Sequence, residues 1–471
     1  MPQHPLPRAP GPEAPAPPTR RNVFAEQPVR DPVQPLMRNT FALLLPLLSL
    51  GCQILAAAPA HPTPARTPAV EAIGQAVNAL GIQLLTQGGT GSAGGNLLLS
   101  PYSIQGALGM TYAGADGVTR QEMARVLHYP PGDEATVHRG FAELRESLEA
   151  LQRQSAARAG EMRRYGQTND PLTLQVANTL FGESGFPFLR PFLELLHQEY
   201  RAPLQQVDFA HDAATARLGI NRWVESQTRG RIRDLVPPGG VDANTRLVLV
   251  NALHLKAPWM HPFPPEATTR DRFRIPGAAA PIEIPTLFST SPLGYLHREG
   301  LTLVAVPYLG GELQFLILLP DQVDGLAALE ARLTPSLLAE GARLSPAEVA
   351  LHLPKLRMEP PMIRLGASLR SLGMGSAFDQ PRGSADFTRM SARAQEEGLH
   401  IAEVFHRAVL ELDERGTEAA AATAVSMAAT SVLLAPPPKP FEVRVDHPFL
   451  FAIQHRPSGA CLFLGRVARP P

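Results

Sequence analysis

Cysteine and lysine are the scarcest chemically useful residues in this chain. Of its 471 residues, two are cysteine (Cys52 and Cys461) and three are lysine. Two cysteines exclude a small domain cross-linked by disulfides, and they exclude a metal cluster held by several thiolates. The cationic residues are therefore almost all arginine, which we attribute to coding bias rather than to function.

Net charge and the common enzyme motifs are also missing. The 43 Lys and Arg residues are balanced by 43 Asp and Glu residues, which argues against a nucleic-acid-binding protein or a polybasic membrane binder. The sequence contains no HExxH, no GxSxG, no Walker A motif and no GxGxxG after an expected strand. It therefore does not indicate an enzyme, and we expect neither a metal nor a cofactor. Apolar residues make up 44% of the chain, enough to bury a sizeable core.

Proline is abundant, and its distribution sets the N-terminus apart. Eleven of the 49 prolines fall in residues 1–36, a composition typical of disorder or of a stretch upstream of a real start at Met37. Residues 37–60 have the positive start, apolar run and small residues of a signal peptide, and the run is too short for a permanent membrane span. Residues 61–69 are typical of a linker. The sequence thus predicts export, to the extracellular space or the periplasm.

A second interpretation of the N-terminal region involves Cys52. Residues 48–52, LSLGC, resemble a bacterial lipoprotein site, in which a lipid is attached to the cysteine, although Ser49 stands where a leucine-like residue is expected. A lipid anchor therefore stays open beside free secretion. In either case Cys461 has no intramolecular partner, and its apolar neighbours predict a buried structural thiol.

Residues 70–471 have the composition of one globular domain. Helical and strand patterns mix without regular alternation, which predicts an α+β fold. A capping-box pattern, Thr119 followed by Glu122, predicts the start of one helix, and residues 153–170 predict a long surface loop. Helices are expected over 70–85, 119–127 and 192–200, and strands over 247–255, 313–319 and 441–445.

Residues 414–431, ERGTEAAAATAVSMAATS, allow two interpretations. Four consecutive alanines favour a helix, but Gly416 and Thr417 precede them and three prolines follow at 436–438. With a period of two, one face runs from Thr417 to Met427 and is small at first and more apolar later. Such a face can slide into a sheet interior without large side chains blocking its entry. The segment is either an Ala-rich surface helix or linker, or a loop able to insert as a strand.

This segment resembles the reactive-loop hinge of the serpins, the large serine protease inhibitors. About a dozen further blocks follow the family's order from about residue 70 to 470, and they resemble a bacterial-type, exported member. Two departures, Leu255 and Ala257 in place of the usual Phe and Gly, keep small or apolar side chains. The loop between Glu414 and Pro448 is longer than in short-loop serpins. The matching blocks include NLLLSPYSI (96–104), ANTLF (177–181), INRWV (220–224), LVNA (249–252), LLP (318–320), LPK (353–355), DHPFLF (446–451) and GRV (465–467).

The resemblance implies a single large domain with three β-sheets, eight or nine helices and an exposed reactive-centre loop. A target protease cleaves this loop and forms an ester with it, and the loop then inserts into the main sheet and traps the acyl-enzyme. Counting along the hinge places the cleaved bond at Thr430–Ser431. No Lys or Arg lies between Arg415 and Lys439, which favours an elastase-like or subtilisin-like target over a trypsin-like one. The implied hinge residues are Glu414, Gly416, Thr417, Glu418, Ala419, Ala420, Ala421 and Ala422.

The resemblance also implies a polar cluster, the shutter, beneath the opening sheet. His406 is then a structural histidine, because no nucleophile or metal partner is spaced around it. The expected partner is a serine protease in a covalent acyl complex, with no nucleic acid, no integral membrane span and a monomeric state. One alternative is a non-inhibitory serpin that binds a ligand or is merely cleaved, and another is an unrelated secreted enzyme. The implied shutter residues are Asn96, Ser100, Ser103, Asn251 and His406.

Overall fold

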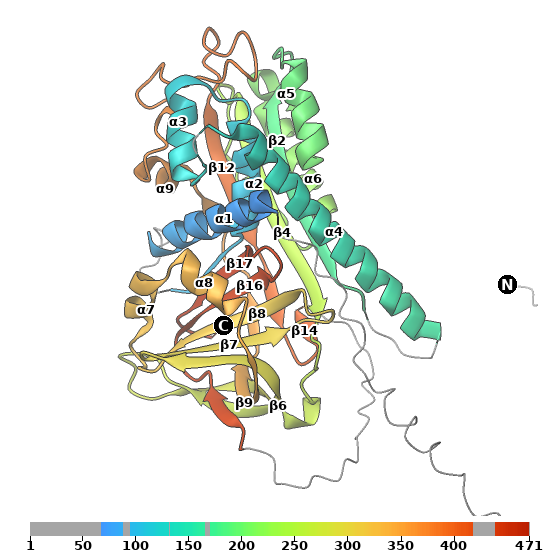
Figure 1. Ribbon diagram of the computed structural model, residues 1–471. Coiled ribbons are helices and arrows are strands. Elements are labelled where there is room, and N and C mark those ends of the chain that lie inside the picture. Colours follow the sequence, from blue (N-terminus) through green and yellow to red (C-terminus); the bar gives the residue numbers. More distant parts are fainter. Residues whose placement is uncertain (1–66, 88–94, 131, 165–169, 418–438, 471) are drawn as a thin grey trace, which may run out of the picture. The chain divides into compact units, whose positions relative to one another are not determined.

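The computed structural model describes residues 67–87, 95–130, 132–164, 170–417 and 439–470 (Figure 1). The first helix, α1 (Pro68–Thr86), begins where the Thr67 hydroxyl accepts a hydrogen bond from the amide of Val70. The last two residues of the predicted linker are thus already helical. The predicted N-terminal extension, the signal peptide and Cys52 lie outside the described residues.

A nine-stranded sheet carries much of the core. The longest strand, β6 (Ile282–Arg298), pairs with β9 along residues 286–294 and with β7 along residues 294–298. The order is β1 (Leu97–Leu99), β17 (Cys461–Val467), β16 (Phe449–His455), β8 (Leu313–Pro320), β7 (Leu301–Pro307), β6, β9 (Pro346–Pro354) and β15 (Phe441–Arg444), with β5 (Thr269–Phe273) on β6.

An eight-stranded sheet contains the hinge. Its central strands β4 (Leu247–Pro258) and β12 (Ile401–Ala408) run parallel, and they are almost continuously buried, as expected for strands covered on both faces. The order is β10 (Leu356–Met358), β13 (Leu410–Leu412), β14 (Gly416–Thr417), β4, β12 and β11 (Ile363–Arg364), with β2 (Thr173–Glu183) on β4 and β3 (Gln205–Val207) on β2.

Helices cover both faces of β4. All twelve residues of α2 (Pro101–Tyr112) are buried, which fits a helix enclosed by its neighbours. Leu249 and Leu253 of β4 belong to the same core cluster as α2, whereas Val248 and Val250 belong to a second cluster with α6 (Phe209–Gln227). The other described helices are α3 (Gly117–Val126), α4 (Glu134–Arg164), α5 (Arg190–Leu195), α7 (Leu326–Arg332), α8 (Pro335–Gly341), α9 (Gly366–Ser371), the π-helix η2 (Leu196–Tyr200) and the 3₁₀ turns η3 (Pro265–Ala267) and η4 (Ser376–Phe378).

Two local predictions are wrong. Residues 153–164 are not a surface loop, because α4 continues to Arg164 with Ser155 and Ala159 buried. The Ser155 hydroxyl accepts a hydrogen bond from the amide of Leu172 at 2.8 Å, which fixes this part of the helix. The predicted capping box also fails, since Asp116 caps α3 and Glu122 instead accepts a hydrogen bond from the amide of Ser376.

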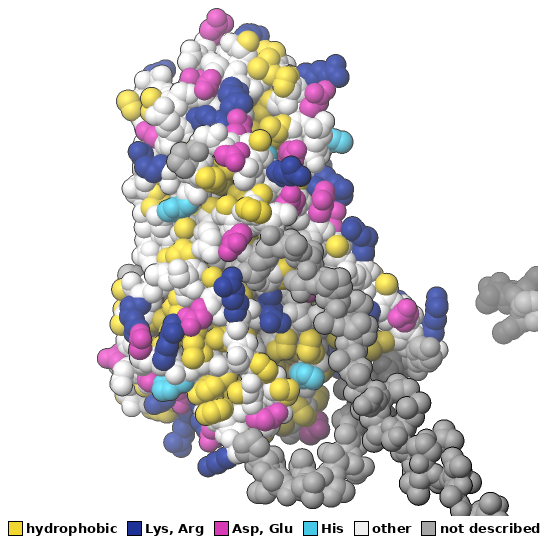
Figure 2. Space-filling view, viewed as in Figure 1, with side chains coloured by type: hydrophobic (Ala, Val, Ile, Leu, Met, Phe, Trp, Pro, Cys, Tyr) yellow, Lys and Arg dark blue, Asp and Glu magenta, His cyan; other side chains and the backbone are white. Residues whose placement is uncertain are grey.

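The surface charge is mixed. Figure 2 shows Lys and Arg side chains interspersed with Asp and Glu over the visible face, without a large patch of one sign. Among the described residues, no helix combines the length and apolarity needed to cross a membrane.

Candidate functional site

The hinge begins in a tight turn after β13. The Asp413 carboxylate accepts hydrogen bonds from the amides of Arg415 (2.8 Å) and Gly416 (3.2 Å). Gly416 has φ +152°, and a Cβ there would lie 2.1 Å from the carbonyl oxygen of Ala257. Only glycine fits at this approach, and it lets the chain turn back into the sheet beside β4.

The first residues of the hinge already pair with β4. Gly416 lies opposite Pro258 and Thr417 opposite Ala257 in an antiparallel register. Thr417 is fully buried, and its hydroxyl lies 2.6 Å from that of Tyr308. Thr417 is therefore an inward-facing residue of a strand, β14, that is described only for Gly416 and Thr417.

An aromatic stack supports this entrance. The rings of Trp259 and Tyr308 are 4.5 Å apart and nearly parallel, at 9°. The indole N–H of Trp259 donates a hydrogen bond to the carbonyl of Asp413 at 2.9 Å, and its backbone amide donates to the carbonyl of Arg415 at 2.7 Å. The stack thus fixes the turn from the side of β4.

Glu414 is held by the cation of Lys355, which lies between β9 and β10. The ammonium group of Lys355 lies 2.9 Å from both carboxylate oxygens, and the Thr268 hydroxyl donates a further hydrogen bond at 2.9 Å. Burial alone would raise the pKa of Glu414, but the hydrogen bonds from Lys355 and Thr268 hold it below its ordinary value. The carboxylate is therefore ionised at neutral pH.

The strands next to the hinge meet only over part of their length. The parallel ladder of β12 and β4 runs from the pair Ile401–Leu247 to the pair Ala408–Leu253. Beyond it the next strand paired on that side of β4 is β14, at Ala257. A segment that continued β14 along β4 would have to separate the β4–β12 ladder.

Four of the five predicted shutter residues meet at that ladder. His406 and Asn251 are directly opposite in the β12–β4 register, and the Nδ1–H of His406 donates to Asn251 Oδ1. Nε2 of His406 accepts a hydrogen bond from the amide of Ser100 at 3.1 Å, and the Ser103 hydroxyl lies 3.2 Å from Asn251 Oδ1. Burial lowers the pKa of His406 to about 3, so the ring is neutral at physiological pH.

Asn96 does not belong to this cluster. Its side-chain oxygen Oδ1 accepts hydrogen bonds from the backbone amides of Ala468 (2.9 Å) and Arg469 (3.0 Å), and its side-chain nitrogen Nδ2 donates to the backbone carbonyl of Arg469. Asn96 precedes β1 at the edge of the nine-stranded sheet, and there it fixes the C-terminal segment.

Asn178 occupies the cluster instead, and sequence reasoning missed it. Its Oδ1 accepts a hydrogen bond from the Ser103 hydroxyl at 2.7 Å, and its amide donates to the carbonyl of Ser103 at 2.9 Å. It faces Asn251 across the β2–β4 ladder. The sequence did contain one signal for this role, namely a polar asparagine among the mostly apolar residues 176–181.

One polar group of the shutter is unsatisfied. The amide nitrogen Nδ2 of Asn251 is buried and has no hydrogen-bond partner among the described residues. Buried amide groups without a partner are uncommon and costly. Asn251 can therefore donate a hydrogen bond to one further acceptor at this point of β4.

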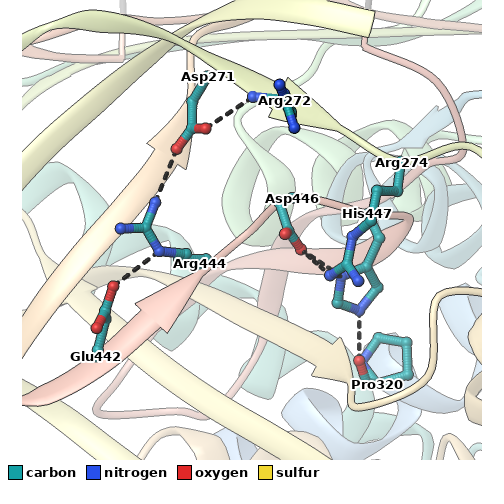
Figure 3. A network of polar contacts seen from close by, with 8 residues as sticks. All are labelled: Asp271, Arg272, Arg274, Pro320, Glu442, Arg444, Asp446 and His447. Atoms are coloured by element: carbon teal, nitrogen blue, oxygen red, sulfur yellow. Dashed lines mark hydrogen bonds and ion pairs between the residues drawn. The ribbon is translucent and has the colours of Figure 1, made fainter. Parts of the chain in front are cut away.

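The chain beyond the loop is fixed in the nine-stranded sheet (Figure 3). On β15, Arg444 forms an ion pair with Asp271 at 3.0 Å. Two residues later the Asp446 carboxylate binds Arg274 at 2.6 Å and Nδ1 of His447 at 2.7 Å, and Nε2 of His447 donates to the carbonyl of Pro320 at 2.5 Å. The predicted cleaved bond Thr430–Ser431 and hinge residues Glu418–Ala422 lie outside the described residues, between these two fixed ends.

Comparison with known proteins identifies the family. The family model described as "Serpin (serine protease inhibitor)" matches residues 75–470. The chain belongs to the serpin family. It shares the serpin fold with uncleaved ovalbumin, at 28% identity and a TM-score of 0.69 over 85% of this chain and 100% of that one.

Two curated serpins are similar over most of their length. The leukocyte elastase inhibitor of Bos taurus is 35% identical over 80% of this chain and 93% of that protein. Serpin B10 of Sorex araneus is 32% identical over 85% of this chain and 100% of that protein. Both are mammalian proteins, so they do not support the bacterial-type, exported subgroup expected from the sequence. Export stays a prediction from residues 37–60.

Proposed function

We propose that this serpin inhibits serine proteases as a suicide substrate whose cleaved loop inserts into the eight-stranded sheet. The observation that carries the proposal is the start of that strand. Gly416 and Thr417 already pair antiparallel with β4, next to the ladder that insertion would divide. The inhibitory function named in the family description is thus matched by a hinge poised at the required place.

The register of β14 predicts where an inserted strand would lie. Continuing the pairs Gly416–Pro258 and Thr417–Ala257 one for one would bring Ala419 opposite Leu255 and Ala421 opposite Leu253. Residues opposite each other in an antiparallel pair share a face, so these alanines would face the main core. Methyl groups need little space there, which supports fast entry of the strand.

The same register brings a hydroxyl to the unsatisfied group of the shutter. Thr423 would lie opposite Asn251, on the face where the Asn251 amide has no partner. A threonine oxygen can accept that hydrogen bond. An inserted strand would therefore complete the shutter cluster as it separates β4 from β12.

Backbone pairing can supply the driving force. One parallel ladder would be replaced by two antiparallel ones, and each net hydrogen bond contributes about 1 kcal/mol. For a strand of roughly a dozen residues the total is comparable to the stability of a whole domain. A driving force of this size supports displacement of an attached protease.

We propose an elastase-like or subtilisin-like target. The stretch between Arg415 and Lys439 contains no Lys or Arg, so a trypsin-like specificity pocket finds no cationic side chain there. The proposed reactive bond is Thr430–Ser431. A relative is named for the inhibition of leukocyte elastase, and this agrees with the proposed class.

The test mixes the purified protein with pancreatic elastase, with subtilisin and with trypsin as the control. We expect a band at the summed mass that survives boiling in detergent with the first two proteases and not with trypsin. Mass spectrometry of the released C-terminal peptide then locates the cleaved bond. Cleavage by a broad panel without any stable band would contradict inhibition and would favour the alternative, a serpin that is only a substrate or a binding protein.

We also propose that the protein is exported through residues 37–60. N-terminal sequencing of protein collected outside the expressing cell is expected to begin close to residue 61. A protein that retains residues 37–60 inside the cell would contradict export. Membrane retention that Cys52→Ser abolishes would instead support the lipid anchor.

A further inference from the structure

The strand that follows the loop, β15, lies at the end of the strand order of the nine-stranded sheet. It pairs with β9, in parallel, from Phe441 opposite Val349 to Arg444 opposite His352. A short strand at a sheet edge has few backbone hydrogen bonds to hold it, and such segments open locally more easily than the core. Side-chain contacts therefore decide how firmly this end of the loop is attached.

Asp271 of β5 links β15 to the rest of the sheet (Figure 3). Its Oδ2 lies 3.0 Å from the guanidinium group of Arg444, and Glu442 binds the same guanidinium group at 2.7 Å. The backbone amide of Arg272 donates a hydrogen bond to Oδ1 of Asp271 at 2.8 Å. Because β5 is itself paired with β6, Asp271 stays in place when β15 opens, whereas Arg444 and Glu442 leave with the strand.

His352 of β9 lies beside this ion pair. Its Nδ1 is 3.9 Å from Oδ2 of Asp271, the same oxygen that binds Arg444. Its side chain is 18% exposed, and its ring packs against that of Phe288 on β6, with 4.6 Å between the centroids. The carbonyl of His352 accepts a hydrogen bond from the amide of Val445 at 2.9 Å, so this residue also holds the backbone directly after β15.

The charges around His352 disfavour its protonation while β15 is attached. Burial lowers the pKa of His352, and the positive charge of Arg444 lowers it further, whereas Asp271 and Glu442 act in the opposite direction. Once β15 has opened, Arg444 no longer neutralises Asp271, and a protonated His352 can take its place beside that carboxylate. The open state therefore binds a proton more tightly than the attached state, and by linkage a fall in pH favours opening.

We propose that β15 is held by an acid-sensitive attachment, in which protonated His352 replaces Arg444 as the partner of Asp271 and releases the strand after the loop. At neutral pH the uncharged ring leaves Asp271 to Arg444, and β15 stays paired with β9. Below about pH 6.5, the ordinary pKa of histidine, the open state gains a proton that the attached state binds less tightly. The proposal concerns the uncleaved protein and does not depend on the proposed inhibition of a protease.

The test is amide hydrogen exchange of residues 441–445 in the uncleaved protein at pH 7.5 and pH 5.5. Protection factors remove the intrinsic effect of pH on exchange and give the equilibrium constant for opening of β15. We expect this constant to be at least about threefold larger at pH 5.5 than at pH 7.5 in the parent protein. His352→Gln is expected to abolish most of that increase. His197→Gln, at an exposed histidine of η2 outside the nine-stranded sheet, is the matched control and is expected to keep it.

A second variant removes the anion for which the two cations compete. Asp271→Asn is expected to raise the opening constant at pH 7.5, because Arg444 loses its partner, and to reduce the further increase at pH 5.5. The Asp271 side chain is 33% exposed, so this variant stays informative even where His352→Gln fails to fold. Opening of β15 that does not change with pH in the parent protein would overturn the proposal. So would an increase at pH 5.5 that is as large in either variant as in the parent.

Discussion

The hydroxyl of Thr417 lies 2.6 Å from the hydroxyl of Tyr308, and both residues are fully buried. Burial raises the pKa of Tyr308 well above its ordinary value, so both groups remain neutral. Backbone pairing with Ala257 holds Thr417 from the other side. The first inward-facing residue of the proposed inserting strand is thus already paired with β4. A substitution at Thr417 is therefore expected to affect insertion at its first step, before any other residue of the loop enters the sheet.

Thr417→Arg is expected to turn the inhibitor into a substrate. A guanidinium group at this position would be buried beside Tyr308 without an anionic partner, which costs several kcal/mol. Hydrolysis of the ester would then be faster than insertion of the loop. We expect cleavage of the loop to continue and the detergent-stable complex to fall at least tenfold, measured as the ratio of the two products on a denaturing gel.

Thr417→Ser is the matched control for that change. It keeps the hydroxyl near Tyr308 and removes only a methyl group, so the complex is expected to form nearly as in the parent protein. A normal yield of complex from Thr417→Arg would contradict insertion that starts at β14.

The ion pair of Glu414 with Lys355 is expected to stabilise the turn before the hinge. The Glu414 side chain is 15% exposed and that of Lys355 is 37% exposed, so solvent weakens the pair only in part. Glu414→Lys would place two cations together and is expected to lower the free energy of unfolding by about 2 kcal/mol. Urea unfolding measures this change.

The charge swap tests whether the pair itself is responsible. Lys355→Glu combined with Glu414→Lys restores opposite charges and is expected to recover at least half of the lost stability. Strictly additive losses in the double variant would show that the two side chains act independently.

The sequence predicted the family because its blocks preserve both residue type and order. It also predicted β4 and β8, because their buried apolar runs are visible without knowing their partners. It failed at the N-terminal cap of α3 and in the second half of α4, where tertiary contacts decide. Glu122 accepts a hydrogen bond from the amide of Ser376, which is 254 residues away, and so it does not cap its own helix.

The shutter shows the same limit at the level of single side chains. Ser100, Asn251 and His406 meet because their blocks lie on adjoining elements. Asn96 is only four residues before Ser100, yet the intervening strand β1 places it at the sheet edge, where it binds the C-terminal segment. A block match gives the neighbourhood of a residue, whereas the direction of its side chain depends on the packing around it.

His406 is expected to make the protein less stable in mild acid. Its pKa is lowered to about 3 in the folded state, whereas an unfolded histidine titrates near pH 6.5. As pH falls below about 6.5, the unfolded state binds a proton and the folded state does not. The free energy of unfolding is therefore expected to fall by up to about 1.4 kcal/mol per pH unit until the folded-state pKa is reached.

His406→Gln separates this titration from the hydrogen bonds. A glutamine can donate to Asn251 and accept from the amide of Ser100, but it does not titrate. We expect its stability to depend less on pH between 4 and 6.5 in urea unfolding than that of the parent protein. Parallel curves for the parent and His406→Gln would contradict the assignment.

His447 is expected to anchor the chain after the loop. Both of its ring nitrogens face acceptors, Asp446 and the carbonyl of Pro320, and the ring is almost fully buried. Burial alone would raise the pKa of Asp446, but hydrogen bonds from His447 and Arg274 lower it. His447→Phe leaves both acceptors without that donor and is expected to cost about 2–4 kcal/mol of unfolding free energy and to speed amide exchange along β15.

Arg444→Gln removes two ion pairs of a half-exposed side chain on β15 itself and is expected to cost less than about 1 kcal/mol. If the two variants exchange equally fast, surface ion pairs rather than His447 hold this end of the loop.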